Sequence, residues 1–135
     1  MDYIAGMLKS HPHPVAVEAA SLETCLEACL ACEQACTACA DACLVEEDVH
    51  RLVRCIRLNL DCAAVCSVTA RVLSRQTAPP SDLIQQQLAT CTAFCKACAV
   101  ECEGHAHRHE HCRVCAEACR ACESACRALI TATWN

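Results

Sequence analysis

The sequence predicts an all-α protein, specifically an antiparallel up-down-up-down four-helix bundle with a short N-terminal helix. Eighteen of the 135 residues are cysteine, and they recur at alternating steps of three and four residues. This period keeps one face of an α-helix turned toward its neighbours in a bundle. Alanine, the residue with the highest helix propensity, is abundant, and only two glycines interrupt the chain. We therefore expect long helices with short connections.

The N-terminal region predicts a short helix that is separate from the bundle. We assign residues 1–13 to an N-terminal segment and residues 14–135 to the cysteine-lined bundle. Apolar residues lie on one side of a helix over residues 1–10, namely Tyr3, Ile4, Met7 and Leu8. Prolines at positions 12 and 14 end this helix. Since proline is tolerated in a first helical turn, we expect the first long helix to run from about Pro14 through Cys43.

The other three helices also have predictable ends. The second should cover residues 46–75, because the prolines at 79 and 80 lack an amide donor and cannot continue a helix. Ser81 or Asp82 is a suitable N-cap for the third helix, and Gln85 completes a capping box with Asp82. Gly104 should end that helix near residue 103. The fourth is expected to start at about residues 105–107 and to end near residue 131.

Each predicted long helix carries one stripe of cysteines. Only the second stripe is interrupted, since its steps of four, three and four are complete when Asn59 is counted. An amide thus stands where the pattern expects a thiol. The stripes, in chain order, are Cys25, Cys29, Cys32, Cys36, Cys39 and Cys43; Cys55, Cys62 and Cys66; Cys91, Cys95, Cys98 and Cys102; and Cys112, Cys115, Cys119, Cys122 and Cys126.

These cysteines indicate metal binding. A single buried cysteine behaves as a small apolar residue, but packing alone does not explain one reactive residue type in all four helices. Cysteines four apart on a helix have nearly parallel Cβ directions, which disfavours a disulfide between them. Disulfides between helices remain an alternative. Cys-x-x-Cys and Cys-x-x-x-Cys on a helix place two sulfurs on one face, where both can bind one ion.

Charge balance favours Cu(I) as the bound metal. Soft thiolates select Cu(I), Zn(II) or iron–sulfur clusters. Several Zn(II) ions with four thiolates each would place repeated charges of −2 in one narrow core, where they repel strongly. Cu(I) with bridging thiolates approaches neutrality at about one ion per cysteine. A zinc or broad heavy-metal buffer is one alternative, and an iron–sulfur or thiol redox protein is another, although the spacings differ from those of ferredoxins.

The cysteine stripes and the histidines before the fourth helix resemble the cytosolic branch of the copper storage proteins. The resemblance covers about residues 20–130. It implies a four-helix bundle that stores multiple Cu(I) ions, a homotetramer of such bundles and no catalysis. The exported branch has a twin-arginine signal, whereas the N-terminus here has neither this motif nor an apolar signal segment. We therefore expect a cytoplasmic protein.

Polar residues are expected at one end of the sulfur-lined interior. His107, His111, Cys115 and Cys119 are each four apart, so two imidazoles would lie above the cysteine column if the helix includes them. Imidazole binds copper, and these two histidines are predicted metal ligands that pass Cu(I) to the thiols. Further candidates for this mouth are Asn59, Asp61, His105 and His109.

Composition also narrows the expected partners. The formal charge is −5 with no basic run, and no segment has the length and apolarity of a membrane-spanning helix, so we expect neither nucleic acid nor membrane as a partner. Copper ions, delivered by a copper chaperone, are the expected partners. Leucines should supply packing outside the sulfur stripes: Leu22, Leu26, Leu30, Leu52, Leu58, Leu60, Leu83, Leu88 and Leu129.

Overall fold

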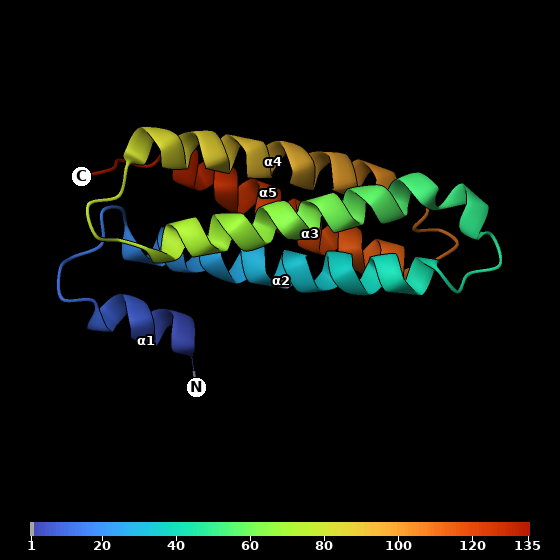
Figure 1. Cartoon of the computed structure of the whole chain (residues 1–135), viewed down its shortest axis with the longest axis horizontal. Coiled ribbons are helices and arrows are strands. Elements are labelled where there is room, and N and C mark those ends of the chain that lie inside the picture. The colour runs from blue at the N-terminus through green and yellow to red at the C-terminus, as the bar shows by residue number, and fades with distance from the viewer. Residues whose placement is uncertain (1) are drawn as a thin grey trace.

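The computed structural model describes residues 2–135, and within that range it contains helices and no strands. The elements are α1 (Tyr3–Ser10), α2 (Ala19–Cys43), the 3₁₀ turn η1 (Val49–Arg51), α3 (Val53–Ser74), α4 (Ser81–Glu103) and α5 (Glu110–Thr131). Helices α2 to α5 lie side by side along one axis and alternate in direction (Figure 1). The predicted four-helix bundle with a short N-terminal helix is confirmed.

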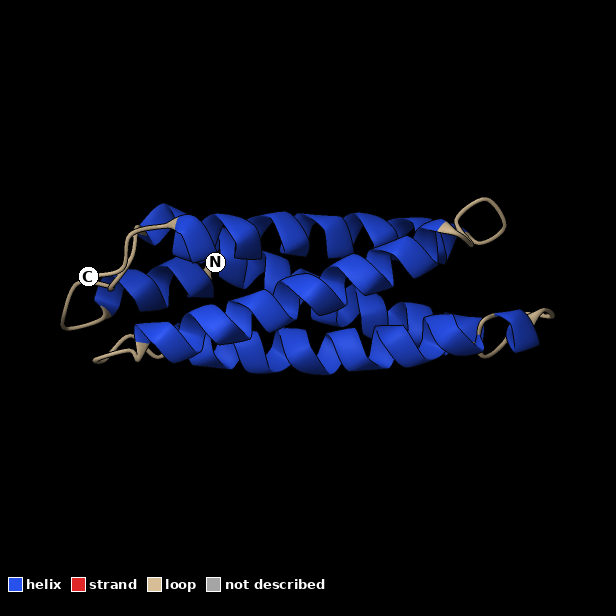
Figure 2. Cartoon of the chain, turned by 90° about the horizontal axis from the view of Figure 1, so that it is seen from above, coloured by secondary structure: helices blue, strands red, loops and turns tan. Residues whose placement is uncertain are grey.

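Neighbouring helices in the bundle follow the chain order. Helix α2 packs against α3 and α5, and α4 packs against the same two helices. The connections 44–52 and 104–109 lie at one end of the bundle, here called the histidine end, and the 75–80 connection and the C-terminus lie at the other (Figures 1 and 2). Helix α1 lies outside the bundle against α2 (Figure 1). The topology thus brings two loops that are distant in sequence to the same end.

Helix α2 begins at Ala19, so the prediction that it starts near Pro14 is wrong. The backbone of Ala16 makes its hydrogen bonds elsewhere: its N–H donates to Gln76 Oε1 at 2.9 Å, and its carbonyl accepts from the N–H of Asn135 at 2.7 Å. Both Ala16 and Val17 are buried. These contacts hold the segment before α2 in a non-helical conformation, against the 75–80 connection and the chain end.

Three further helix boundaries differ from the prediction. The 3₁₀ turn and a break at Leu52 precede α3, which therefore starts at Val53 instead of near residue 46. Pro80 is the N-cap of α4 without a side-chain hydrogen bond, so the proposed Ser81 or Asp82 cap is wrong. Gly104 ends α4 as predicted. Residues 104–108 form a turn, which delays the start of α5 to Glu110.

Leucine and isoleucine close the bundle at the end opposite the histidines. Five fully buried side chains come from the helix ends that meet there: Leu22, Leu73, Ile84, Leu88 and Leu129. Leu26 and Leu52 are also buried, and Leu58 is half-buried. Leu30, Leu60 and Leu83 are instead 42%, 53% and 63% exposed, so their predicted packing role is wrong. Around these three leucines, cysteines occupy most of the inward positions of the same helices.

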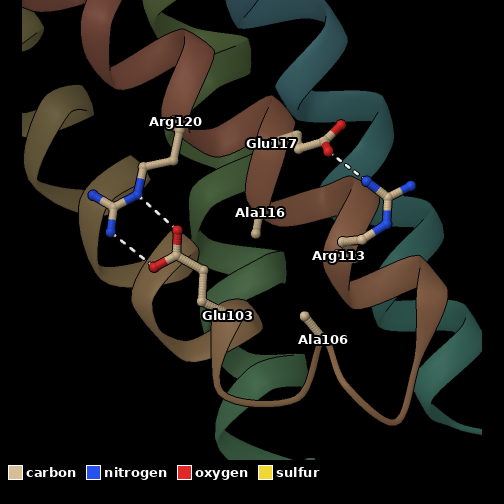
Figure 3. Close-up of a pocket in the computed structure, with 6 residues that line it drawn as sticks. All are labelled: Glu103, Ala106, Arg113, Ala116, Glu117 and Arg120. Carbon is tan, nitrogen blue, oxygen red and sulfur yellow. Dashed lines mark hydrogen bonds and ion pairs between the residues drawn. The ribbon is translucent and has the colours of Figure 1, made fainter.

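The outer surface carries charged side chains in pairs. Arg120 on α5 donates to both carboxylate oxygens of Glu103 on α4, at 2.8 and 2.9 Å, and Arg113 pairs with Glu117 along α5 (Figure 3). The guanidinium of Arg120 holds the pKa of Glu103 below its usual value. The shallow pocket between these pairs is lined by Glu103, Ala106, Arg113, Ala116, Glu117 and Arg120 and holds no thiol. Because all eighteen cysteines are buried, thiol chemistry is confined to the interior.

No helix within residues 2–135 combines the length and the apolarity that a membrane span requires.

Candidate metal centre

The interior of the bundle is a continuous column of sulfur atoms. All eighteen cysteines are free and buried. The Sγ atoms of Cys36 on α2 and Cys119 on α5 are 3.6 Å apart, and those of Cys62 on α3 and Cys95 on α4 are 3.8 Å apart. Sulfurs also meet across the diagonal, since the Sγ atoms of Cys36 and Cys98 are separated by 3.9 Å. The four stripes therefore converge on one axis.

Neighbouring groups of thiols share their members. Several sets of four donor atoms lie within 4.8 Å of one another. Cys36 and Cys119 belong to two of these sets, as do Cys32 and Cys122. Four such all-thiol sets are Cys29, Cys91, Cys122 and Cys126; Cys32, Cys66, Cys95 and Cys122; Cys32, Cys36, Cys62 and Cys119; and Cys36, Cys98, Cys115 and Cys119. One sulfur is thus placed to bridge two ions along the column.

The spacing fits metal ligands better than disulfides. The Sγ atoms of Cys32 and Cys36, four apart on one helix, are separated by 3.8 Å, and those of Cys25 and Cys126 on different helices are also separated by 3.8 Å. A disulfide requires about 2.05 Å. Two sulfurs bound to one metal ion at about 2.3 Å each lie nearly 4 Å apart when the geometry is tetrahedral.

In the metal-free core, burial and thiol–thiol hydrogen bonds favour the protonated form of several cysteines. Burial raises the pKa of Cys43 to about 11. The hydrogen bond with Cys115, together with burial, raises the pKa of Cys36 far above its usual range, and Cys122 acts in the same way on Cys95. Charged thiolates are unfavourable in this low-dielectric interior unless a cation accompanies them. A metal ion that enters must therefore displace thiol protons.

Asn59 is fully buried among the thiols and does not reach a solvent-facing mouth. Its Oδ1 accepts hydrogen bonds from Cys98 and Cys115 at 3.0 and 3.2 Å, and its Nδ2 lies 3.6 Å from Cys55 Sγ. The amide thus satisfies its polar atoms with thiols alone. Sequence reasoning identified its place in the stripe but not its depth.

Asp61 lies on the outer surface, so its predicted place at the mouth is wrong. Its carboxylate accepts a hydrogen bond from Arg57 Nε at 2.8 Å, and its side chain is about one-third exposed. Two residues along an α-helix correspond to a turn of about 200°. Asp61 therefore points away from the core because Asn59 points into it.

At the histidine end, one imidazole contacts the thiol column. The Nδ1 atom of His111 lies 3.3 Å from Cys39 Sγ and 3.7 Å from Cys112 Sγ. Its Nε2 atom lies 2.8 Å from Glu46, a residue of the connection between α2 and α3. Cys39, Cys43, Cys112 and His111 form a set of four donors within 4.8 Å of one another. The column thus ends in a mixed thiol–imidazole group.

His109 stands beside His111 but contacts carboxylates. The two rings stack with their centroids 5.5 Å apart. His109 Nδ1 lies 2.7 Å from Glu46, and its Nε2 lies 3.0 Å from Asp48. The hydrogen bond with His109 lowers the pKa of Asp48. These contacts fix both rings at the junction between the connection 44–52 and the start of α5.

His105 and His107 do not touch the thiols. His107 is exposed in the turn before α5, so the expected four-residue ladder from His107 through His111 is wrong, because the helix has not yet begun there. His105 pairs instead with Glu101 on α4 at 2.8 Å. Of the four histidines in this segment, the structure brings His111 to the thiols and His109 to its side.

Sequence reasoning missed Glu46 and Asp48 as members of this cluster. The signal was the acidic run Glu46-Glu47-Asp48 in the connection 44–52. In an up-down-up-down bundle this connection and the one at 104–109 meet at the same end. The two loops had to be paired through the topology before the carboxylates could be assigned to the histidines.

Solved structures with the same arrangement are copper proteins. The copper storage protein Ccsp from Streptomyces lividans, in a structure loaded with 10 copper equivalents, is 49% identical to this chain with a TM-score of 0.92, and the match covers 94% of this chain and 97% of that one. The Cu(I)-bound copper storage protein BsCsp3 is 38% identical with a TM-score of 0.73, over 82% of this chain and 99% of that one.

Sequence comparison agrees with the structural similarity. The cysteine-rich protein YhjQ of Bacillus subtilis (strain 168) is 39% identical over 96 residues, which are 71% of this chain and 83% of that protein. A sequence model of the copper storage protein family matches residues 18–131, which include all four cysteine stripes. The chain therefore belongs to the copper storage protein family.

Proposed function

We propose that this protein stores and buffers multiple Cu(I) ions on the thiolates of its core. The observation that carries the proposal is the sharing of cysteines between successive groups of four. Shared thiolates bridge ions, and about one Cu(I) per thiolate leaves the buried column near neutrality. Repeated Zn(II) sites on the same thiols would each retain a charge of −2. The relatives loaded with copper support the same assignment.

The protein acts as a non-catalytic store in the cytoplasm. A structure of the Streptomyces lividans relative is that of a cytosolic copper storage protein. Residues 14–135 form the storage unit, and residues 1–13 are an appended segment. Four copies assemble into a homotetramer, for which exposed apolar side chains on α1 and α2 offer contact surface: Tyr3, Met7 and Leu30. Light scattering coupled to size-exclusion chromatography tests this assembly.

Copper enters and leaves at the histidine end. The opposite end is closed by buried leucines, whereas His111 is partly exposed and touches both Cys39 and Cys112. His107 is exposed in the turn that precedes α5, where it receives Cu(I) from solvent or from a copper chaperone. His105 and His109 hold carboxylates beside this route. The thiols, with His111 at the end, are the ligands of the stored ions.

An anaerobic titration tests the storage function. Cu(I) is added to reduced, metal-free protein in the presence of a competing chromogenic chelator. Storage predicts that the chelator stays copper-free until roughly one Cu(I) per cysteine has been added. Saturation at four or five Zn(II) with little capacity for Cu(I) would establish the zinc buffer instead. A brown protein as isolated, with visible absorbance, would point to an iron–sulfur protein.

A further inference from the structure

The donor group at the histidine end differs in chemistry from the rest of the column. It consists of three thiols and one imidazole, Cys39, Cys43, Cys112 and His111, whereas the other sets named above contain thiols alone. The three cysteines are buried, and the His111 side chain is 26% exposed. We propose that this group is a Zn(II) site, which binds one zinc ion when the column is free of copper.

The distances between the donors match a tetrahedral zinc centre. With Zn–S at about 2.3 Å and Zn–N at about 2.05 Å, a tetrahedron has S···S edges of about 3.8 Å and S···N edges of about 3.6 Å. The Sγ atoms of Cys39 and Cys112 are 3.8 Å apart. His111 Nδ1 lies 3.3 Å from Cys39 Sγ and 3.7 Å from Cys112 Sγ. Three edges of the tetrahedron are therefore preformed.

The second ring nitrogen of His111 has the partner that zinc-binding histidines usually have. Its Nε2 lies 2.8 Å from Glu46 Oε2. A carboxylate in this position fixes the tautomer that carries the proton on Nε2, so that the lone pair of Nδ1 faces the thiols. Glu46 is held in turn by His109, whose Nδ1 lies 2.7 Å from the same carboxylate oxygen. The ring is therefore oriented for a metal before one arrives.

Charge explains why zinc would choose this group over the all-thiol sets. Zn(II) with three thiolates and a neutral imidazole has a net charge of −1, whereas four thiolates leave −2. The charge also lies at the edge of the bundle, where water screens it, instead of in the middle of the column. Occupation of His111 and three thiols also places zinc across the proposed copper route. Only this consequence rests on the proposed copper function; the zinc site does not.

Zn(II) titration of the reduced, metal-free protein tests the site. The full chain is used in the oligomeric state that it adopts in solution. A chromogenic zinc chelator should report one equivalent per chain that binds more tightly than all later ones. His111→Ala should weaken that first equivalent at least tenfold, and Glu46→Gln should weaken it about 10- to 100-fold by releasing the ring. Two matched controls should leave it unchanged: Asp48→Asn, at a residue whose carboxylate contacts His109 and Arg108 but not His111, and Cys126→Ala, which removes a thiol at the far end.

Co(II) supplies a second readout. Its absorption should report three sulfurs and one nitrogen in tetrahedral geometry in the unaltered protein, and this spectrum should be lost in His111→Ala. Far-UV circular dichroism of each variant shows whether the bundle is intact. A first zinc equivalent that stays equally tight in a folded His111→Ala variant would overturn the proposal, as would a Co(II) spectrum of four sulfurs. Cu(I) capacity, measured in parallel on the same samples, reports separately on the storage function.

Discussion

Asn59 Oδ1 accepts a hydrogen bond from the thiol of Cys98 at 3.0 Å, deep inside the column of sulfurs. The same oxygen accepts from Cys115 at 3.2 Å on the facing helix. One amide therefore joins α3, α4 and α5 through thiol donors, at a position where the pattern of α3 would otherwise place a cysteine. Because an amide does not ionise, it adds no charge to a core that must already accommodate many thiolates.

Replacement of Asn59 should affect the metal-free fold more than the copper capacity. We expect Asn59→Ala to lower the free energy of unfolding by about 1–3 kcal/mol, since it leaves a cavity and removes the acceptor of several buried thiols. Urea unfolding of reduced apo-protein measures this loss. Thr69→Ala, which removes a buried polar group on α3 that bonds to Gln87, is the matched control. If the Asn59 variant alone lost more than one Cu(I) of binding capacity, the amide would have to be a copper ligand.

His111 should control the rate of copper loading. Because its Nδ1 is the imidazole nitrogen in contact with Cys39 and Cys112, His111→Ala is expected to slow transfer from a Cu(I) chelator to the thiols. Capacity should remain nearly complete, since thiols supply most ligands. His107→Ala, which alters an exposed turn, should slow loading less, and the double variant should be the slowest. Stopped-flow measurement of the rate of Cu(I) transfer in all three variants tests this order. An unchanged rate in the double variant would show that the histidines do not assist copper entry.

The reduced, metal-free protein should already be folded. Its far end is packed with leucine and isoleucine, and its thiols satisfy one another as neutral hydrogen-bonding groups. Far-UV circular dichroism under anaerobic conditions should therefore show high helicity. Leu88→Ala, at a fully buried position, should cost about 2–5 kcal/mol, whereas Leu83→Ala, at an exposed position on the same helix, should cost little. Low helicity of the unaltered apo-protein would contradict this prediction.

Alkaline pH should destabilise the metal-free protein. Burial raises the pKa of Cys43 from near 9 to about 11, so the folded state holds this proton more tightly than the unfolded chain does. The corresponding stability is fully present below about pH 9 and is lost as the pH rises through about 11. Thermal unfolding between pH 8 and roughly pH 11 should show a falling midpoint for apo-protein. Copper-loaded protein, whose thiolates are already deprotonated, should change less over the same range.

The protons displaced by copper provide a related test. Metal binding to protonated thiols releases protons, so addition of Cu(I) to weakly buffered apo-protein should acidify the solution in proportion to the thiolates formed. Apparent Cu(I) affinity should correspondingly rise with pH up to the thiol pKa values. A pH indicator dye in the anaerobic titration records the release. Cu(I) uptake without acidification would mean that the core thiols were ionised beforehand.

The sequence alone predicts the helices, the inward thiols and the soft-metal chemistry, because the period of a helix is local and the cysteines follow it throughout the chain. It located Gly104 as the end of α4 and Asn59 as the exception in its stripe. It placed the starts of α2 and α5 too early, since backbone bonds at Ala16 and the turn before Glu110 depend on segments distant in sequence.

The composition of the histidine end follows from the tertiary structure and could not be predicted from helical periodicity. Whether His107 or His109 stands next to His111 depends on where α5 begins. The contact of Glu46 with His111 joins the connection 44–52 to the start of α5, although the two residues are separated by 65 positions in the chain. Helical periodicity does not specify such contacts, because they arise from the order in which the helices pack. The column of thiols thus follows from the repeating cysteine pattern, whereas the residues at its histidine end follow from the way the topology brings distant segments together.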